Sequence, residues 1–521
     1  MTDILLSTLN AKFAHSSLAL RYLYANLGEL RERAEIAEFI WNERSCDVAE
    51  SILHRTPKIV GLGVYIWNAT ETLELVRTLK SVRPEVIIVL GGPEVSHETA
   101  EQEIVELADY TITGEGDLAF AELCRAILVE NEPPAARTIV GGTPKLTELV
   151  SPYAYYNDLD VEKRSIYVEA SRGCPFRCEF CLSSLDLAVR QFPLEPFLAD
   201  MKILLDRGVR QFKFIDRTFN LSPRISSAIL EFFLEHIELG VFVHFEMVPD
   251  RLPRALRDVV AKFPEGSIQF EIGIQTFDEG TSERISRVQD LGRLEDNMTF
   301  LTTQTHVHIH ADLIIGLPGE TMESFARGFD RLVAIGPHEV QVGILKRLRG
   351  TSIIRHNDEY EMVYAATPPY EILQNSVLSF ETLARLKRFA RSWDLVANRG
   401  NFQESCALLW NDCGPFDGFL RFSDWLFEEV GHFTGVALDR LVKLMLRYLT
   451  EVAPSPISKL EAATVLGRDY TRGRGRLPSF LADITGESTR FRPVGGGEHR
   501  ATPKRQARHL DAQVGAQAAK P

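Results

Sequence analysis

Three cysteines lie close together in the segment SRGCPFRCEFC. They are Cys174, Cys178 and Cys181, and their CxxxCxxC spacing lets one loop present three thiolates to a single centre. Three thiolates can hold three corners of a cubic four-iron four-sulfur cluster and leave the fourth iron without a protein ligand. A structural zinc site generally needs four closed ligands, and no CxxC or HxxxH pair lies nearby, so zinc is the weaker interpretation. The spacing predicts a cluster with one open iron.

This segment resembles the signature of the radical S-adenosylmethionine (SAM) enzymes, in which an aromatic residue, here Phe180, precedes the last cysteine. The resemblance implies that the amino and carboxylate groups of SAM chelate the open iron. It also implies that the reduced cluster cleaves SAM to a 5′-deoxyadenosyl radical. Such enzymes need an electron donor, so we expect a protein partner such as a flavodoxin or a ferredoxin.

Further residues resemble those that contact SAM in the branch that includes the coproporphyrinogen dehydrogenases and the methylthiotransferases. They follow successive predicted strands, in the segments FKFIDRTFN, FEMVPDRL, EIGIQTFDEG and HADLIIGLPGET. The SAM-binding residues that the resemblance implies are Phe180, Asp216, Glu246, Gln275, Arg287 and Asp312. A single buried carboxylate is more often a capping or ion-paired group, but joint placement at strand ends favours a site.

Two other groups of side chains could bind a metal. His306, His308, His310 and Asp312 alternate along one predicted strand and therefore fall on one face. We favour a simpler interpretation, in which they are the polar lining of a barrel. Cys406 and Cys413 cannot fill four ligand positions by themselves, and we expect them to be ordinary thiols.

The first part of the chain alternates short apolar runs with helix-length segments. Strands are predicted at residues 4–6, 36–40, 59–64, 86–90 and 110–113, with helices that include 17–27 and 70–81. This alternation predicts a doubly wound parallel sheet with helices on both faces. Ligands of such sheets bind beyond the carboxyl ends of the strands. Here those ends carry glycine pairs: Gly61 and Gly63, Gly91 and Gly92, Gly114 and Gly116.

The glycine pairs match neither a GxGxxG dinucleotide fingerprint nor a P-loop. A doubly wound domain before a radical SAM barrel resembles the cobalamin-binding class of radical SAM enzymes. The resemblance implies cobalamin beside Gly91, Gly92, Gly114 and Gly116, with Tyr65, Trp67 and Asn68 as further neighbours. The DxHxxG motif, whose histidine ligates cobalt in some cobalamin domains, is absent, so we expect no histidine on the lower face.

A second alternating region follows a segment rich in proline, glycine and tyrosine. Its predicted strands are residues 166–170, 211–215, 242–247, 267–274, 306–315 and 339–346. Six such units predict a partial (β/α)6 barrel of the TIM type, with its site at the carboxyl ends of the strands. Beyond residue 368 the apolar residues recur only at helical spacing, as at Leu438, Leu441, Val442 and Met445.

The predicted fold class is therefore α/β: a Rossmann-like cobalamin-binding sheet, a TIM-like radical SAM barrel and a helical C-terminal domain. The predicted boundaries are 1–140 for the cobalamin-binding domain, 141–165 for a linker, 166–368 for the barrel, 369–486 for the helical domain and 487–521 for a disordered tail. The segments ILKRLRGTSI and PPYEIL resemble a subgroup that carries an uncharacterised C-terminal domain.

The composition is that of an ordinary globular protein, with 521 residues, 45% of them hydrophobic. No apolar run approaches the roughly 20 residues of a membrane span, so we expect no membrane association. A formal charge of −14 opposes broad binding to nucleic acid, and we expect a small-molecule substrate. The first residues lack the apolar stretch of a secretory signal, which favours a cytoplasmic location.

The resemblance favours an enzyme that uses the radical to methylate an unactivated carbon, with cobalamin relaying the methyl group from SAM. Cobalamin-assisted rearrangement, cyclisation or oxidation without methyl transfer stays open as an alternative. A non-catalytic sensor of cobalamin or redox state is a second alternative. Methylthio transfer to RNA is disfavoured, because such enzymes carry a further cysteine trio where this chain has only Cys46 and Cys124.

Overall fold

The computed structural model describes residues 2–474, 476–487 and 502–517. The chain divides into two compact units. The first comprises Met1–Arg217, Lys346–Arg355 and Tyr364–Glu371, and the second comprises Thr218–Leu345, His356–Val363 and Ile372–Pro521. This division differs from the predicted boundaries, because the first two strands assigned to the barrel belong to the first unit.

Six parallel strands form the first sheet, in the order β2-β1-β3-β4-β5-β6. Their bounds are β1 Ile4–Asn10, β2 Ala34–Ile40, β3 Ile59–Gly63, β4 Ile87–Gly91, β5 Tyr110–Thr113 and β6 Thr138–Val140. The five predicted strands are all present, which confirms the Rossmann-like fold. The sequence analysis missed β6, because three residues are too few to show a hydrophobic period.

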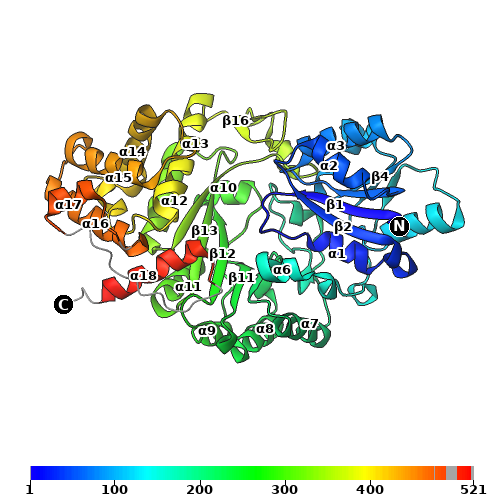
Figure 1. Ribbon diagram of the computed structural model, residues 1–521. Helices are drawn as coiled ribbons and strands as arrows, with labels where there is room; N and C mark the ends of the chain where they lie inside the picture. Colours follow the sequence, from blue (N-terminus) through cyan, green and yellow to red (C-terminus); the bar gives the residue numbers. More distant parts are fainter. Residues whose placement is uncertain (1, 475, 488–501, 518–521) are drawn as a thin grey trace. The chain divides into compact units, whose positions relative to one another are not determined.

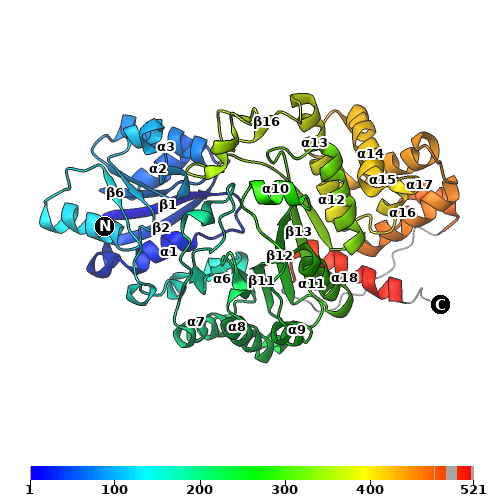
Figure 2. The same cartoon turned by 180° about the vertical axis from the view of Figure 1, so that it is seen from behind.

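Helices cover both faces of this sheet (Figures 1 and 2). Their bounds are α1 Leu18–Ala25, α2 Ser45–Leu53, α3 Ala69–Val82, α4 Glu103–Leu107 and α5 Ala119–Arg125. Neighbouring residues of β1 point to opposite faces: Leu5 packs in the core that contains α2 and α3, and Leu6 in the core that contains α1 and α5. Burial on both faces explains why the strands are continuous apolar runs.

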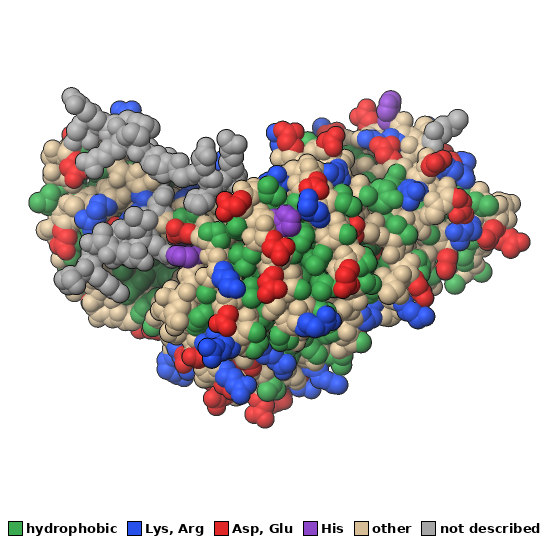
Figure 3. Space-filling model, turned by 90° about the horizontal axis from the view of Figure 1, so that it is seen from below, with side chains coloured by type: hydrophobic (Ala, Val, Ile, Leu, Met, Phe, Trp, Pro, Cys, Tyr) green, Lys and Arg blue, Asp and Glu red, His purple; other side chains and the backbone are tan. Residues whose placement is uncertain are grey.

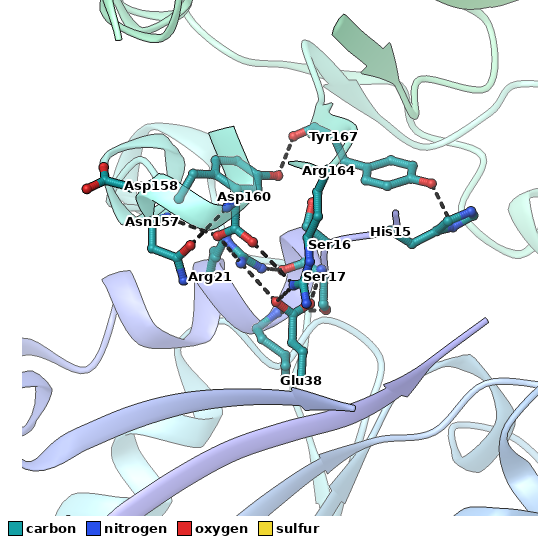
Figure 4. Close-up of polar contacts among 12 residues, drawn as sticks. His15, Ser16, Ser17, Arg21, Glu38, Asn157, Asp158, Asp160, Arg164 and Tyr167 are labelled. Atoms are coloured by element: carbon teal, nitrogen blue, oxygen red, sulfur yellow. Dashed lines mark hydrogen bonds and ion pairs between the residues drawn. The ribbon is translucent and has the colours of Figure 1, made fainter. Parts of the chain in front are cut away.

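The predicted linker, residues 141–165, is fixed by buried charges (Figure 4). It contains α6 (Asp158–Lys163), which begins with a capping box between Asn157 and Asp160. Arg21 of α1 contacts Glu38 of β2 at 2.9 Å and Asp160 at 2.6 Å, and Arg164 contacts the same two carboxylates. Two cations and two anions thus neutralise one another where the linker meets the first sheet.

The strands of the second alternating region are also parallel. In the first unit, β7 (Ile166–Val168) pairs with β10 (Gln211–Phe214). In the second unit, β11 pairs with β12, β12 with β13, and β13 with β14. Their bounds are β11 Phe242–Met247, β12 Ile268–Gln275, β13 His308–Ile315 and β14 Glu339–Ile344. All six predicted strands are present. The helices between and after them are α7 Leu194–Asp206, α8 Pro223–Glu235, α9 Arg254–Val260, α10 Glu279–Arg284, α11 Leu291–Gln304 and α12 Met322–Ile335.

Helices dominate the rest of the second unit, as predicted. Their bounds are α13 Phe380–Trp393, α14 Pro415–Val430, α15 Leu438–Arg447, α16 Lys459–Arg474 and α17 Ser479–Thr485. An aromatic cluster joins α12, α13 and α14, in which Phe329, Phe389 and Trp393 pack against Phe416 and Phe419. Two short strands, β15 (Val363–Tyr364) and β16 (Ile372–Gln374), precede these helices.

The prediction of a disordered tail at 487–521 is wrong for α18, which spans Lys504–Gln517. Arg505 contacts Glu339 at 2.6 Å and Asp394 at 2.8 Å, and Gln506 donates to Gln269 at 2.7 Å. His509 is buried. The helix therefore packs against the rest of the second unit through polar contacts. A polar composition alone does not show that such a segment has partners elsewhere in the chain. The remaining tail residues, 488–501 and 518–521, lie outside the described residues.

Acidic and basic side chains are interspersed on the face that Figure 3 shows. Where that face is described, it therefore offers no continuous field of one sign to a polyanion such as nucleic acid. In the described residues, no helix has the length and apolar character needed to cross a membrane.

Candidate functional site

The three clustered cysteines lie on a loop that is closed at its base by two short antiparallel strands. These strands are β8 (Ser171–Arg172) and β9 (Arg190–Gln191). Cys174 and Cys178 are buried, and Cys181 is half-buried. The three thiols thus share one cysteine loop, residues 173–189, and their role as cluster ligands stays a prediction.

Backbone contacts keep this loop tight. The Cys174 amide donates to the Asp186 carbonyl at 2.8 Å, and the Cys181 amide donates to the Cys178 carbonyl at 3.1 Å. Gly173 has a φ of +89°, and a side chain there would collide with the Ala188 carbonyl. Only glycine combines this backbone angle with so close an approach.

The segment Lys346–Arg355, which belongs to the first unit, also holds the cysteine loop. Glu179, between Cys178 and Phe180, is buried and forms an ion pair with Arg355. The Ile353 amide donates to the Glu179 carbonyl at 3.0 Å. Phe180, proposed as a SAM contact, is half-buried beside this anchor.

The donor set of the loop fits an iron–sulfur cubane better than a single metal ion. Among the described residues, no group of three His, Cys, Asp or Glu side chains could hold one metal ion. A cubane has different requirements, because each thiolate binds a separate iron atom and the thiols need not converge on one point. Three thiols on one loop, two of them buried, suit the cluster.

Asp216 follows β10 in the chain, and its side chain contacts residues 170 and 171, just before the cysteine loop. Its carboxylate accepts hydrogen bonds from the Ala170 amide at 3.0 Å and from the Ser171 hydroxyl at 2.6 Å. Burial raises the pKa of Asp216 to about 7. The structure therefore places this residue where it supports the strand that leads into the cysteine loop.

The other proposed SAM contacts lie on the second unit, three of them at the carboxyl halves of its parallel strands and Arg287 after α10. Glu246 lies near the end of β11, Gln275 ends β12, and Asp312 of β13 is in register with Gly273. Arg287 donates to the Ile274 carbonyl at 3.2 Å and also to the Gly273 carbonyl. Gln275 has a φ of +73°. The structure thus gathers Gln275, Arg287 and Asp312 around Gly273.

A cavity of about 580 Å³ opens beyond the carboxyl ends of the first sheet, entirely within the first unit. This volume falls in the range of roughly 300–1,000 Å³ typical of ligand and cofactor sites. Its lining includes seven glycines: Gly61, Gly63, Gly91, Gly92, Gly114, Gly116 and Gly142. Leu182, Leu185 and Asp186 of the cysteine loop form another part of its wall.

Glycine occupies positions in the cavity wall for two separate structural reasons. At Gly92, with a φ of +107°, a Cβ would lie 2.5 Å from the Val64 carbonyl oxygen, so the turn itself requires glycine. At Gly91, Gly114 and Gly142 a Cβ would meet no atom closer than 3.7 Å. Gly114 and Gly142 also have positive φ values, +76° and +73°, so their backbone favours glycine in any case. At all three positions the missing side chain leaves open space at the cavity wall, which suits a broad and flat ligand such as the corrin of cobalamin.

The predicted cobalamin neighbours divide between the cavity and its support. Tyr65 lines the cavity, and Trp67 stacks on it with the ring centroids 4.4 Å apart. Asn68 is buried outside the lining and donates to the Leu9 carbonyl at 3.0 Å. His97 is the one histidine among the described lining residues. The expectation that no histidine ligates cobalt stays a prediction, with His97 as the residue to test.

Sequence reasoning missed the residues that connect the cavity wall with the cysteine loop. Glu115 and Asp117, in the GEGD turn after β5, line the cavity and contact Arg172, the residue before Gly173. The GEGD and SRGC segments were both visible in the sequence, but nothing in one chain shows that two such distant segments pair.

Three segments of the chain match known protein families. Residues 5–124 match the B12 binding domain, residues 168–332 match the radical SAM superfamily, and residues 358–489 match a protein family of unknown function, DUF4080. The order of the three segments agrees with the predicted domain order.

Individual proteins resemble longer stretches of the chain. The cobalamin-dependent radical SAM methyltransferase TokK of Streptomyces tokunonensis is 26% identical over 339 residues, which cover 57% of this chain and 48% of TokK. The structure of the radical SAM methyltransferase TsrM of Kitasatospora setae, with cobalamin and a 4Fe-4S cluster bound, matches with a TM-score of 0.55 and 16% identity over 100% of both chains. The structure of OxsB, a cobalamin-dependent SAM radical enzyme, matches with a TM-score of 0.57 and 14% identity over 99% of this chain and 79% of OxsB.

The two structural likenesses show the fold alone, and the chain spans about half the length of the curated relatives it matches. Together, the cysteine loop and the matched domains define a radical SAM enzyme. The chain combines a segment that matches the B12 binding domain with one that matches the radical SAM superfamily and a C-terminal segment that matches DUF4080. This confirms the predicted cofactors: cobalamin, SAM and an iron–sulfur cluster.

Proposed function

We propose that the enzyme methylates an unactivated carbon of a small molecule. The observation that carries this proposal is the shared wall in the first unit. Leu182, Leu185 and Asp186, which follow the last cluster cysteine, line the same cavity as the glycine turns of the first sheet. A cluster on the loop and cobalamin in the cavity would therefore be neighbours, as is required if one substrate is to meet both the radical formed at the cluster and the methyl group carried by cobalamin.

The proposal gives each set of residues a task. Cys174, Cys178 and Cys181 hold the cluster, and the backbone turns at Gly91, Gly92, Gly114 and Gly116, with Tyr65, receive cobalamin. Trp67 and Asn68 support that pocket. Phe180, Asp216, Glu246, Gln275, Arg287 and Asp312 bind and orient SAM. When bound, the cofactors supply the radical and the cobalt that relays a methyl group.

We also propose an electron donor and a class of substrate for the reaction. A flavodoxin or a ferredoxin supplies the electron that reduces the cluster, and the substrate is a small molecule rather than a nucleic acid. The relative TokK, described as a methyltransferase, supports methyl transfer. A chain with seven cysteines and an oxygen-sensitive redox cluster is suited to a reducing compartment, and we place the enzyme in the cytoplasm.

Product analysis tests this function before the substrate is known. Two uses of SAM give two products: 5′-deoxyadenosine from reductive cleavage and S-adenosylhomocysteine from methyl donation. The reduced, cofactor-loaded enzyme is incubated with SAM and cell extract, and both products are quantified by mass spectrometry. We expect both from the wild type, and no deoxyadenosine from Cys178→Ala. Deoxyadenosine alone would point to rearrangement, cyclisation or oxidation, and neither product would point to a sensor.

A further inference from the structure

Arg172 makes an unusually dense set of ion pairs at the base of the cysteine loop. Its guanidinium contacts Asp117 through two nitrogen–oxygen pairs, at 2.9 and 3.1 Å, and contacts Glu115 at 2.9 Å. It also contacts Glu169 at 2.9 Å and lies over the ring of Tyr22. The Arg172 side chain is only 14% exposed. Forked contacts of this kind fix the orientation of an arginine as well as its position.

Arg190 repeats the contact from the other strand of the same base. β8 and β9 place Arg172 directly opposite Arg190. Arg190 forms an ion pair with Glu115 and contacts Asp186, inside the cysteine loop, at 2.8 Å. It also donates to the Pro144 carbonyl at 3.2 Å. Both ends of the cysteine loop are therefore attached to the turn that carries Glu115 and Asp117.

That turn is itself a wall of the cavity. Gly114, Glu115, Gly116 and Asp117 all line it, and Arg172 itself contributes to the lining. A ligand that stabilises one conformation of the turn therefore also fixes the positions of the carboxylates that contact the two arginines. In the reverse direction, a cluster that orders the cysteine loop fixes Arg172 and Arg190, and through them the turn.

We infer that Arg172 and Arg190 are positioning residues that couple cobalamin binding in the cavity to cluster assembly on the cysteine loop. This inference rests on the assignment of the two cofactors in the proposed function, but not on the reaction that they perform. Coupling between two binding sites is reciprocal, and typical couplings change affinity by about 5- to 150-fold. The cluster-loaded protein should therefore bind cobalamin more tightly than the cluster-free protein by a factor in that range.

The test is the ratio of two dissociation constants for cobalamin, measured anaerobically by equilibrium dialysis on the full chain with and without a reconstituted cluster. For the wild type we expect a ratio in the stated range. For Arg172→Met we expect the ratio to fall to about one, and for Arg172→Lys to recover in part because the charge is retained. Arg77→Met is the matched control: Arg77 also pairs with two carboxylates, Glu74 and Glu103, but on the exposed face of α3. Its ratio should equal that of the wild type.

A direct contact between Arg172 and cobalamin would give a different result. In that case Arg172→Met would weaken binding equally in the two forms, the ratio would not change, and the inference would be overturned. A ratio of one in the wild type, or no cobalamin binding in either form, would overturn it as well. The ratio does not depend on turnover, so an enzyme that couples the cofactors but transfers no methyl group would refute the proposed function and support the inference.

A second variant and a second measurement cover the case in which Arg172→Met does not fold. Asp117→Asn keeps the size of the side chain and removes one of the carboxylates. We expect it to lower the ratio less than Arg172→Met. Hydrogen exchange of residues 173–189 in the cluster-free protein should slow when cobalamin is added to the wild type, and should slow less for Asp117→Asn. Equal slowing in both proteins would contradict the inference.

Discussion

Arg21 Nη2 lies 2.6 Å from Asp160 Oδ2, and both side chains are almost completely buried although 139 positions separate them in the chain. Glu38 and Arg164 complete a neutral group of four charges (Figure 4). The group joins α1 and β2 of the cobalamin domain to the segment that leads into β7. It therefore fixes the start of the strand that carries the cysteine loop.

Removing one member of this group should be costly. Arg21→Met leaves two buried carboxylates facing one arginine, and breaking a buried pair in this way typically costs about 3–5 kcal/mol. The double variant Arg21→Met, Asp160→Asn leaves Glu38 and Arg164 as a balanced pair, so its loss of unfolding free energy should be smaller than the sum of the single losses. Urea denaturation measures all three. Arg77→Met, on the surface, should stay within about 0.5 kcal/mol of the wild type; an equally small effect of Arg21→Met would refute the assignment.

Acid should weaken the docking of α18. Burial lowers the pKa of His308, His338 and His509, which lie next to one another with Arg505 and Glu339 close by. An unfolded histidine titrates near pH 6.5, so below that pH the unfolded chain binds more protons than the folded chain and stability falls. The loss begins near pH 6.5 and continues as pH drops through the lowered folded values.

The variant His509→Gln isolates this effect, because glutamine can still donate to the Asn398 carbonyl that His509 contacts at 3.0 Å. Unfolding free energies of the two proteins are compared between about pH 7 and pH 5. We expect a shallower decline for the variant. Glu320 contributes in the opposite direction, because burial raises its pKa to about 8 and the folded state therefore gains stability at low pH. This contribution is the same in both proteins, so it cancels in the difference between the two curves. Parallel curves would show that His509 does not titrate with unfolding.

The cluster should depend on three cysteines only. The triple replacement of Cys174, Cys178 and Cys181 by alanine should abolish the absorbance and the electron paramagnetic signal of the reconstituted cluster, because only these three thiols have the CxxxCxxC spacing. Cys406→Ala is the control, since Cys406 is buried in the helical region and burial raises the pKa of its thiol, which keeps it protonated. A full cluster in the triple variant would mean that the ligands lie elsewhere.

The cavity should lose cobalamin when it is filled. In Gly91→Leu the backbone of β4 can stay as it is, because a Cβ at this position meets no atom closer than 3.9 Å. The larger side chain would occupy open space at the cavity wall. We expect at least about tenfold weaker cobalamin binding, a loss of roughly 1.4 kcal/mol, with a melting temperature close to that of the wild type. Unchanged binding would remove Gly91 from the cobalamin site.

The regular elements of this fold could be predicted because burial imposes a pattern on them. β1 and β13 are continuous or alternating apolar runs, and the cysteine spacing is local to one loop. β6 and α18 could not be predicted in the same way. Thr138–Val140 gains its place from one neighbouring strand, and α18 docks through Arg505, Gln506 and His509, whose partners lie on distant segments.

The same limit applies to the site. The glycines at the strand ends indicated a ligand, because glycine at several successive turns leaves room. Arg172 gave no such signal, since an arginine before a cysteine is compatible with many surroundings. Its partners Glu115 and Asp117 are more than fifty positions away, and only the folded chain brings their charges together.

The central claim is transfer of a methyl group from SAM to carbon, and isotope labelling tests it most directly. The reduced enzyme, loaded with cobalamin and cluster, is incubated with cell extract and SAM that carries a ¹³C, deuterium-labelled methyl group. We predict a labelled small molecule that forms only when cobalamin, reductant and all three cluster cysteines are present, together with deoxyadenosine and S-adenosylhomocysteine. Deoxyadenosine formation with no labelled methyl group in any molecule of the extract would contradict the account.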